Sequence, residues 1–234
     1  MFKKIKRMLI LLLVILAEAG PTAACSSSCP SSCDCNNIGL FSVPQDLPKT
    51  ITNLNLRDNL IATLSQSDFF RYSSLTSLYL SNNVISVINS GTFNLETLTH
   101  LKIDSNELTS VRSDMFVGLV NLQYIDLGKN LIASLPANSF VGLKKLLYLG
   151  LDHNDIHSIE PGTFSATPQL RTLNLQSNRI SAVPADVFVN MTELQNLYNN
   201  STRSFLCSKH KPENFHINDT NNSPDNSPDN SPDN

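Results

Sequence analysis

The nine residues LTSLYLSNN, at positions 75–83, contain the pattern that decides the fold. Their alternation predicts a short strand that directs Leu78 and Leu80 to one face. The intervening Ser77, Tyr79 and Ser81 then lie on the opposite face. One such strand cannot bury its leucines alone, so it needs neighbours of the same kind beside it.

The same pattern recurs along the chain every 23 or 24 residues. Six complete repeats begin at Ile51, Leu75, Leu98, Leu122, Leu146 and Leu170, and a seventh begins at Leu194 but loses the pattern. Ten residues after the asparagine that ends each motif there is a phenylalanine: Phe69, Phe93, Phe116, Phe140, Phe164 and Phe188. Fixed spacing of this kind predicts a solenoid, in which each repeat forms one coil and the strands stack into a parallel sheet.

An asparagine occupies the turn after every strand, at Asn59, Asn83, Asn106, Asn130, Asn154 and Asn178. A tight turn inside a stack buries backbone N–H and C=O groups that need partners. An asparagine side chain can both donate and accept hydrogen bonds, so we interpret these six residues as a structural ladder.

The motif LxxLxLxxN at this spacing resembles the 24-residue repeat of extracellular leucine-rich-repeat proteins, from residue 25 to about residue 198. In repeat number and length the chain is most similar to a variable lymphocyte receptor or a related invertebrate protein. The resemblance implies an α/β fold, a right-handed horseshoe solenoid with a parallel β-sheet on its concave face. It implies a convex side that is mostly irregular or short helical.

The N-terminus has the features of a secretory signal peptide over residues 1–19, with residue 24 as an alternative end. Four basic residues precede the apolar run from Met8 to Leu16, which is shorter than the roughly 20 helical residues that span a bilayer. An uncleaved membrane anchor and a lipoprotein acylated at Cys25 are the alternatives. We therefore expect a secreted, extracellular protein, or a cell-surface protein if the chain normally continues into an anchor.

The charge of the chain argues against a nucleic-acid partner. Removing the signal peptide takes four of the 17 basic residues and one of the 20 acidic residues, which leaves a formal charge of −6. Nucleic-acid affinity depends on lysine and arginine contacts with phosphates, so we expect no such partner.

Residues 25–50 resemble the cysteine-rich N-terminal cap of the family, with cysteines at Cys25, Cys29, Cys33 and Cys35. Closely spaced cysteines after a signal peptide predict two disulfides, and four cysteines allow three connectivities. The spacing departs from the family, in which the fourth cysteine follows the other three. A zinc site is the alternative.

The C-terminal part differs more from the family. We assign 51–193 to the six repeats, 194–215 to a partial repeat with a degenerate cap, and 216–234 to a disordered low-complexity tail. The lone Cys207 suggests a disulfide-linked dimer or a free thiol. Sequons for N-glycosylation occur at Asn190, Asn199, Asn200, Asn218 and Asn221.

The outward positions of the strands form the candidate binding surface, because they vary while the inward positions do not. Tyrosine combined with serine, asparagine and glycine is typical of recognition surfaces, although tyrosine also simply favours strands. Mixed charges favour an extracellular protein or a neutral glycan over a polyanion. The candidate ligand-binding residues are Asn55, Arg57, Tyr79, Lys102, Asp104, Tyr124, Asp126, Tyr148, Asp152, His153 and Asn174.

No catalytic residue, metal site or cofactor is predicted. Asp152, His153 and Asp155 lie close in sequence, but no repeat position supplies a nucleophile with a base beside it. Cys207, His210 and His216 have only a loosely metal-like spacing. We expect a non-enzymatic recognition protein, for antigens or pathogens in immunity. The alternative is an adhesion protein of the extracellular matrix or of signalling that binds a self-ligand.

Overall fold

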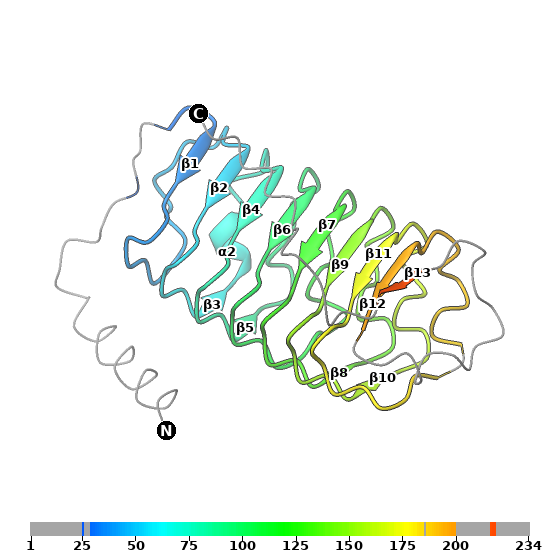
Figure 1. The fold of residues 1–234 in the computed structure, drawn as a ribbon. Helices are drawn as coiled ribbons and strands as arrows, with labels where there is room; N and C mark the ends of the chain where they lie inside the picture. The colour runs from blue at the N-terminus through cyan, green and yellow to red at the C-terminus, as the bar shows by residue number, and fades with distance from the viewer. Residues whose placement is uncertain (1–24, 26–28, 185, 200–215, 219–234) are drawn as a thin grey trace, which may run out of the picture.

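A computed structural model describes residues 25, 29–184, 186–199 and 216–218, and over this range the chain forms stacked coils (Figure 1). One parallel sheet, the main sheet, lines one side of the stack with its strands in the order β1-β2-β4-β6-β7-β9-β11-β12-β13. These strands are Ser32–Asp34, Asn53–Asn55, Ser77–Tyr79, His100–Lys102, Tyr124–Asp126, Tyr148–Gly150, Thr172–Asn174, Asn196–Tyr198 and His216–Asn218. The predicted solenoid with a parallel sheet is confirmed.

The strands pair without any slip in register. Leu78 of β4 lies opposite Leu54 of β2 on one side and Leu101 of β6 on the other, and the same alignment continues along the sheet. In the main sheet, the central residue of each strand from β2 to β12 is fully buried: Leu54, Leu78, Leu101, Ile125, Leu149, Leu173 and Leu197. Successive side chains of a strand point to opposite faces, so the residues before and after each central residue point outward.

The other side of the coils is not wholly irregular. Two short parallel sheets form there, one from β3 (Thr63–Leu64) and β5 (Val87–Ile88) and one from β8 (Ser134–Leu135) and β10 (Ser158–Ile159). The single-turn helix α2 (Gln66–Phe69) adds very little helix. Within the described residues, no helix has the length and apolar character needed to cross a membrane.

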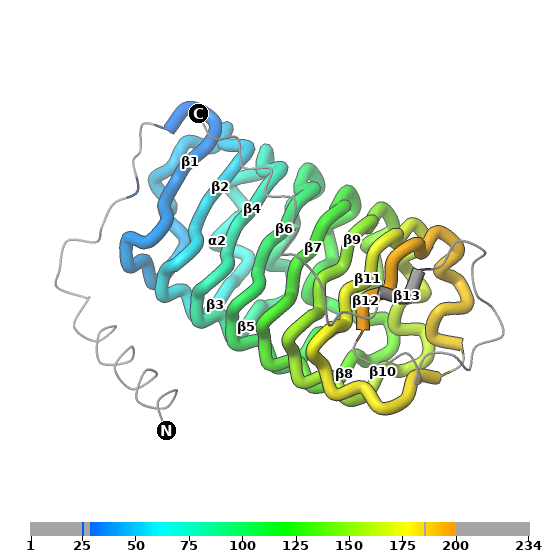
Figure 2. The backbone as a smooth tube through the Cα atoms, in the orientation of Figure 1, coloured from blue at the N-terminus to red at the C-terminus, as the bar shows by residue number. Residues whose placement is uncertain are grey.

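The phenylalanine of each repeat packs against the phenylalanine of the next coil. The rings stack with centroid distances of 5.8–6.4 Å, from Phe69 at one end to Phe188 at the other. The first five rings are buried, whereas Phe188, Ile180 and Val183 of the sixth repeat are only partly buried. The tube in Figure 2 shows the regular succession of coils that this spine connects.

Each asparagine of the ladder ties its coil to the coil before it. The Asn130 Nδ2 donates to Leu127 O of its own coil (3.0 Å) and to Ile103 O of the preceding coil (3.1 Å). Its Oδ1 accepts the Leu108 N–H of the preceding coil at 3.0 Å. All six asparagines repeat this arrangement, with the Nδ2 donating across the coil boundary at 2.8–3.1 Å.

The residue before each ladder asparagine adopts a left-handed backbone conformation. Its φ lies between 51° and 57° in all six repeats, at Asp58, Asn82, Ser105, Lys129, His153 and Ser177. This conformation is uncommon for residues other than glycine. The backbone N–H groups of Asp58, Asn82, Ser105, Lys129 and His153 donate to the next coil, as in Lys129 N to Asp152 O at 2.8 Å.

The N-terminal cap continues the sheet by one strand. Its disulfides join Cys25 to Cys35 and Cys29 to Cys33, which confirms the two predicted bonds and selects one of the three connectivities. Strand β1 contains Cys33 and pairs in register with β2. The carbonyl of Cys35 accepts the Nδ2 of Asn59 at 2.8 Å, so the cap serves as the preceding coil for the first repeat.

The seventh repeat differs from its prediction, because its strand is regular. β12 pairs with β11 in the register of the other strands, and Leu194 and Leu197 are buried. The departure comes at Asn199, which is 2 % exposed at an inward position that carries leucine or isoleucine in the six complete repeats. The Asn199 side chain is buried in the described structure, and glycosylation at this sequon stays a prediction.

Of the other four sequons, the structure describes Asn190 and the backbone of Asn218. Asn190 is exposed, whereas Asn200 and Asn221 lie outside the described residues. Asn218 belongs to β13, which pairs with β12. Residues 216–218 pair with β12 through their backbone, whereas the assignment of residues 216–234 to a disordered tail stays a prediction. Residues 219–234, Cys207 and the predicted signal peptide lie outside the described residues.

We expect Asn130→Ala to lower the free energy of unfolding by roughly 2–4 kcal/mol, because it leaves several buried backbone groups without partners. Urea denaturation of the wild type and the variant would measure the difference. The exposed Asn94 provides a control, since Asn94→Ala should change the free energy by less than about 0.5 kcal/mol. Equal effects of the two substitutions would contradict the structural role of the ladder.

Candidate ligand-binding face of the main sheet

The outward side chains at the third, fifth and seventh positions of the repeats, between β2 and β11, form a surface that we call the main-sheet face. Aromatic side chains at the third position stack across three adjacent strands. The His100 and Tyr124 ring centroids lie 6.0 Å apart, and those of Tyr124 and Tyr148 lie 4.4 Å apart with the rings nearly parallel. Stacking of this kind fixes the rings before any ligand arrives.

A second aromatic contact lies nearer the N-terminal cap. The Arg57 guanidinium carbon lies 4.6 Å from the centroid of the Tyr79 ring. In the stacked row, the Lys102 Nζ lies 5.7 Å from the centroid of the Tyr124 ring. Tyr79 occupies the fifth position of its repeat, whereas Tyr124 and Tyr148 occupy the third. The tyrosines expected to form one strip therefore belong to two separate groups.

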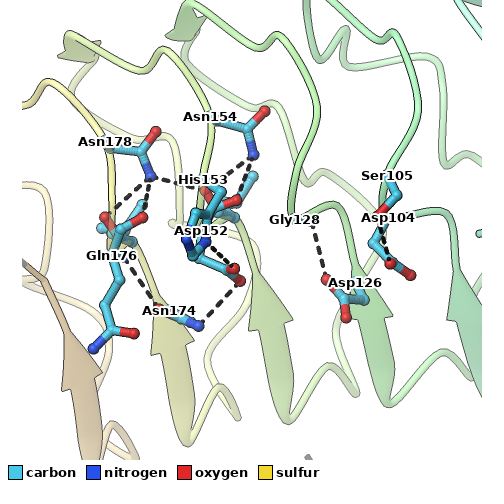
Figure 3. A network of polar contacts seen from close by, with 12 residues as sticks. Asp104, Ser105, Asp126, Gly128, Asp152, His153, Asn154, Asn174, Gln176 and Asn178 are labelled. Atoms are coloured by element: carbon cyan, nitrogen blue, oxygen red, sulfur yellow. Dashed lines mark hydrogen bonds and ion pairs between the residues drawn. The ribbon is translucent and has the colours of Figure 1, made fainter. Parts of the chain in front are cut away.

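Three carboxylates, those of Asp104, Asp126 and Asp152, lie on the same face as the aromatic row, and Figure 3 shows polar contacts that they make. Ser81 Oγ donates to Asp104 at 2.5 Å. The Gly128 N–H donates to Asp126 Oδ1 at 3.0 Å (Figure 3). The Asp152 carboxylate accepts the Asn174 Nδ2 at 3.0 Å and lies 2.8 Å from His153 Nδ1. Ser81, expected to face solvent, is buried by its contact with Asp104.

Two glycines allow these carboxylates to approach one another. A Cβ atom on Gly128 would lie 3.0 Å from Asp152 Oδ1 and 3.1 Å from Asp126 Oδ1. A Cβ atom on Gly150 would lie 2.7 Å from Asp126 Oδ1. His100, Gly128 and Gly150 lie at outward positions of the repeats, although the candidate ligand-binding residues named from the sequence do not contain them. The signal was present, because aligning the repeats places Asp126 directly opposite Gly150.

Burial and a neighbouring carboxylate change the protonation of Asp126. Burial, together with the nearby Asp104 carboxylate, raises the pKa of Asp126 to about 6, although the Gly128 N–H opposes the shift. Burial and the Asp126 carboxylate also raise the pKa of the Tyr124 and Tyr148 hydroxyls above its usual range. The two tyrosines are therefore neutral hydrogen-bonding groups at physiological pH.

The remaining predicted residues divide between the two ends of the face. Asn55 lies with Arg57 and Tyr79 near the cap, where its Nδ2 donates to Asp34 at 3.0 Å. The other group, on β6, β7, β9, β11 and the turns after them, contains Lys102, Asp104, Tyr124, Asp126, Tyr148, Asp152, His153 and Asn174. His153 is exposed at the left-handed turn position.

The residues considered for catalysis do not form a common site. Asp155 forms an ion pair with Arg179 at 3.1 Å, whereas Asp152 contacts His153. Across the described ranges, no three His, Cys, Asp or Glu side chains group as metal ligands would. Cys207 and His210 lie outside those ranges, and His216 is described only through its backbone in β13.

The fold and this face together define a scaffold of stacked repeats, a class that typically binds macromolecules and is not enzymatic. A family profile described as "Leucine rich repeat" matches residues 49–95, 96–156 and 148–202, so the chain belongs to the leucine-rich-repeat family. A comparison with curated proteins gives no match. Membership of the family supports a protein-binding role for the chain.

We expect Asp126→Asn to stabilise the protein at about pH 7.5 by roughly 1–3 kcal/mol, because the native state disfavours the charged form of Asp126. The pKa of Asp126 is about 6 in the native state, compared with an ordinary value of 3.8. The wild type therefore gains stability as the pH falls from about 6 to 3.8. The advantage of the variant should therefore shrink at about pH 4, as measured by urea denaturation at both pH values.

The exposed carboxylate of Asp186 provides a control of matched charge for this substitution. We expect Asp186→Asn to leave stability within about 0.5 kcal/mol of the wild type at both pH values. An Asp126→Asn variant that is less stable than the wild type at neutral pH would contradict the conclusion that the native state disfavours the charged form of Asp126.

Proposed function

We propose that this chain is a secreted recognition protein that binds a protein or glycan through its main-sheet face, in antigen or pathogen recognition. The observation that carries the proposal is the stacked row of His100, Tyr124 and Tyr148, since it is already assembled without a ligand. Binding surfaces gain affinity when their side chains are ordered in advance. Tyrosine also offers a large amphipathic contact at a low cost in conformational entropy.

Secretion is supported by the two disulfides of the cap. Disulfides form and persist in oxidising compartments, and they are rare in the cytosol. Together with the signal-like N-terminus, the Cys25–Cys35 and Cys29–Cys33 bonds favour an extracellular protein. The exposed sequon at Asn190 is compatible with this compartment.

We expect insect cells to secrete the product of the full-length gene, with a mature N-terminus at Gly20 or Cys25. N-terminal sequencing of the secreted protein would identify the cleavage site. A non-reducing gel of the same protein should show a dimer that the substitution Cys207→Ser abolishes. Retention of the protein inside the cell would contradict secretion, and a wild type that runs only as a monomer would contradict the dimer.

The binding proposal can be tested with a panel of intact microbial cells and purified extracellular-matrix proteins. We expect the secreted protein to bind members of the microbial set, and the variant Tyr79→Ala/Tyr124→Ala/Tyr148→Ala to bind them about tenfold more weakly or worse. Circular dichroism would establish that the variant is folded. Phe70→Ala/Val117→Ala/Val141→Ala removes exposed apolar side chains away from the main sheet and should leave binding unchanged.

The panel also separates the two biological roles. Binding confined to the matrix proteins would favour adhesion to a self-ligand over immune recognition. Loss of binding in the control variant, with the tyrosine variant unaffected, would place the site on the opposite side of the coils. Failure to bind any member of either set would overturn the proposal.

A further inference from the structure

The carboxylates of Asp126 and Asp152 converge on one point of the main-sheet face. Their Oδ1 atoms lie within 3.1 Å of the position that a Gly128 Cβ would occupy. Asp126 also leans over Gly150, where a Cβ would lie 2.7 Å from its Oδ1. No side chain projects from either glycine, and the two carboxylates occupy the space directly over the glycine backbone.

Two acids elsewhere in the chain pair with arginine, whereas no arginine of the described residues pairs with the acids of the face. Asp114 and Asp155 form ion pairs with Arg112 and Arg179 at 3.0 and 3.1 Å. Among the described residues, no lysine or arginine forms an ion pair with Asp126, whose donors are the Gly128 N–H and the more distant Tyr124 hydroxyl, at 3.5 Å.

Asp104 and Asp152 are held mainly by neutral donors. Asp104 accepts hydrogen bonds from the hydroxyls of Ser81 and Ser105, and Asp152 accepts one from the Asn174 amide. Only His153, which is exposed, can add a positive charge when protonated. Lys102 lowers the pKa of Asp126 from a distance, but its Nζ lies over the Tyr124 ring. Among the described residues, no lysine or arginine forms an ion pair with these three carboxylates, so acidic groups predominate at the centre of the face.

The stacking of the tyrosines restricts which ligand can bind here. A sugar ring packs against the open face of an aromatic ring, but the Tyr124 ring lies between His100 and Tyr148. The Tyr124 ring thus offers its edge and hydroxyl rather than a free face. An anionic ligand would be repelled by the three carboxylates, whereas a guanidinium carries several donors that can bridge two carboxylates at once.

We propose that this region docks a basic segment of a protein ligand, with an arginine guanidinium bridging the carboxylates of Asp126 and Asp152 from their solvent side. The inference rests on the proposed function and narrows it, because it selects a protein over a glycan as the ligand. The guanidinium donates to both carboxylates and accepts nothing in return. The formal charge of −6 expected for the mature chain favours the approach of such a segment.

The test uses the secreted full-length product, labelled with ¹⁵N-glycine, and a synthetic peptide with two arginines separated by glycine. The chain has only eight glycines, so the amide signals of Gly128 and Gly150 can be followed individually by NMR. A second peptide carries citrulline in place of arginine, which keeps the shape and removes the charge. Calcium chloride, titrated alone, tests for a simple metal ion.

We expect the arginine peptide to shift the Gly128 and Gly150 signals in a saturable manner, and the citrulline peptide to bind about tenfold more weakly. Asp126→Asn/Asp152→Asn should abolish the shifts. Asp114→Asn/Asp186→Asn, which removes two carboxylates away from the main sheet, should preserve them.

Three results would overturn the inference: no shift with the arginine peptide, equal shifts with both peptides, or shifts with calcium alone. These outcomes are distinct from failure of the proposed function. Binding to the panel that depends on Tyr79, Tyr124 and Tyr148, without any response to arginine, would retain the recognition face and reject the arginine site.

Discussion

The hydrogen bonds of the asparagine ladder are the interaction on which the rest of the structure depends. Each ladder side chain satisfies backbone groups in two coils, so no coil is complete without the one before it. The same constraint fixes the register of the strands, because the turn that follows each strand is attached to the preceding turn. The outward side chains consequently fall into straight rows, and the stacking of Tyr124 on Tyr148 follows from that alignment.

The periodic part of the sequence predicts the fold because burial imposes the same residue type at the same position in every coil. Leu78 and Asn83 are interpretable from one repeat alone. The left-handed turns were not predicted, since Ser105 and Lys129 carry no signal for that backbone conformation. The regular seventh strand was also missed, because Leu197 keeps the inward pattern although the asparagine of the turn is lost.

The face was predicted as a set of residues but not as an arrangement. Outward positions are free to vary, so their grouping depends on which position of one repeat lies beside which position of the next. Asp126 and Asp152 occupy different positions in adjacent repeats, and they converge only because Gly128 and Gly150 lie between them. The raised pKa of Asp126 indicates that the native state disfavours the charged form of this carboxylate. Strain of this kind is commonly concentrated at functional sites.

The cap and the seventh strand share one property, which is that both join the main sheet in the common register. Each internal coil therefore makes the same connections as the other internal coils, and a whole repeat can be gained or lost between the ends without altering either. The number of repeats and the identity of the side chains on the main-sheet face can therefore change independently of each other. Duplication of a repeat would widen the surface by one strand, and exchange of a repeat would move one row of side chains as a unit.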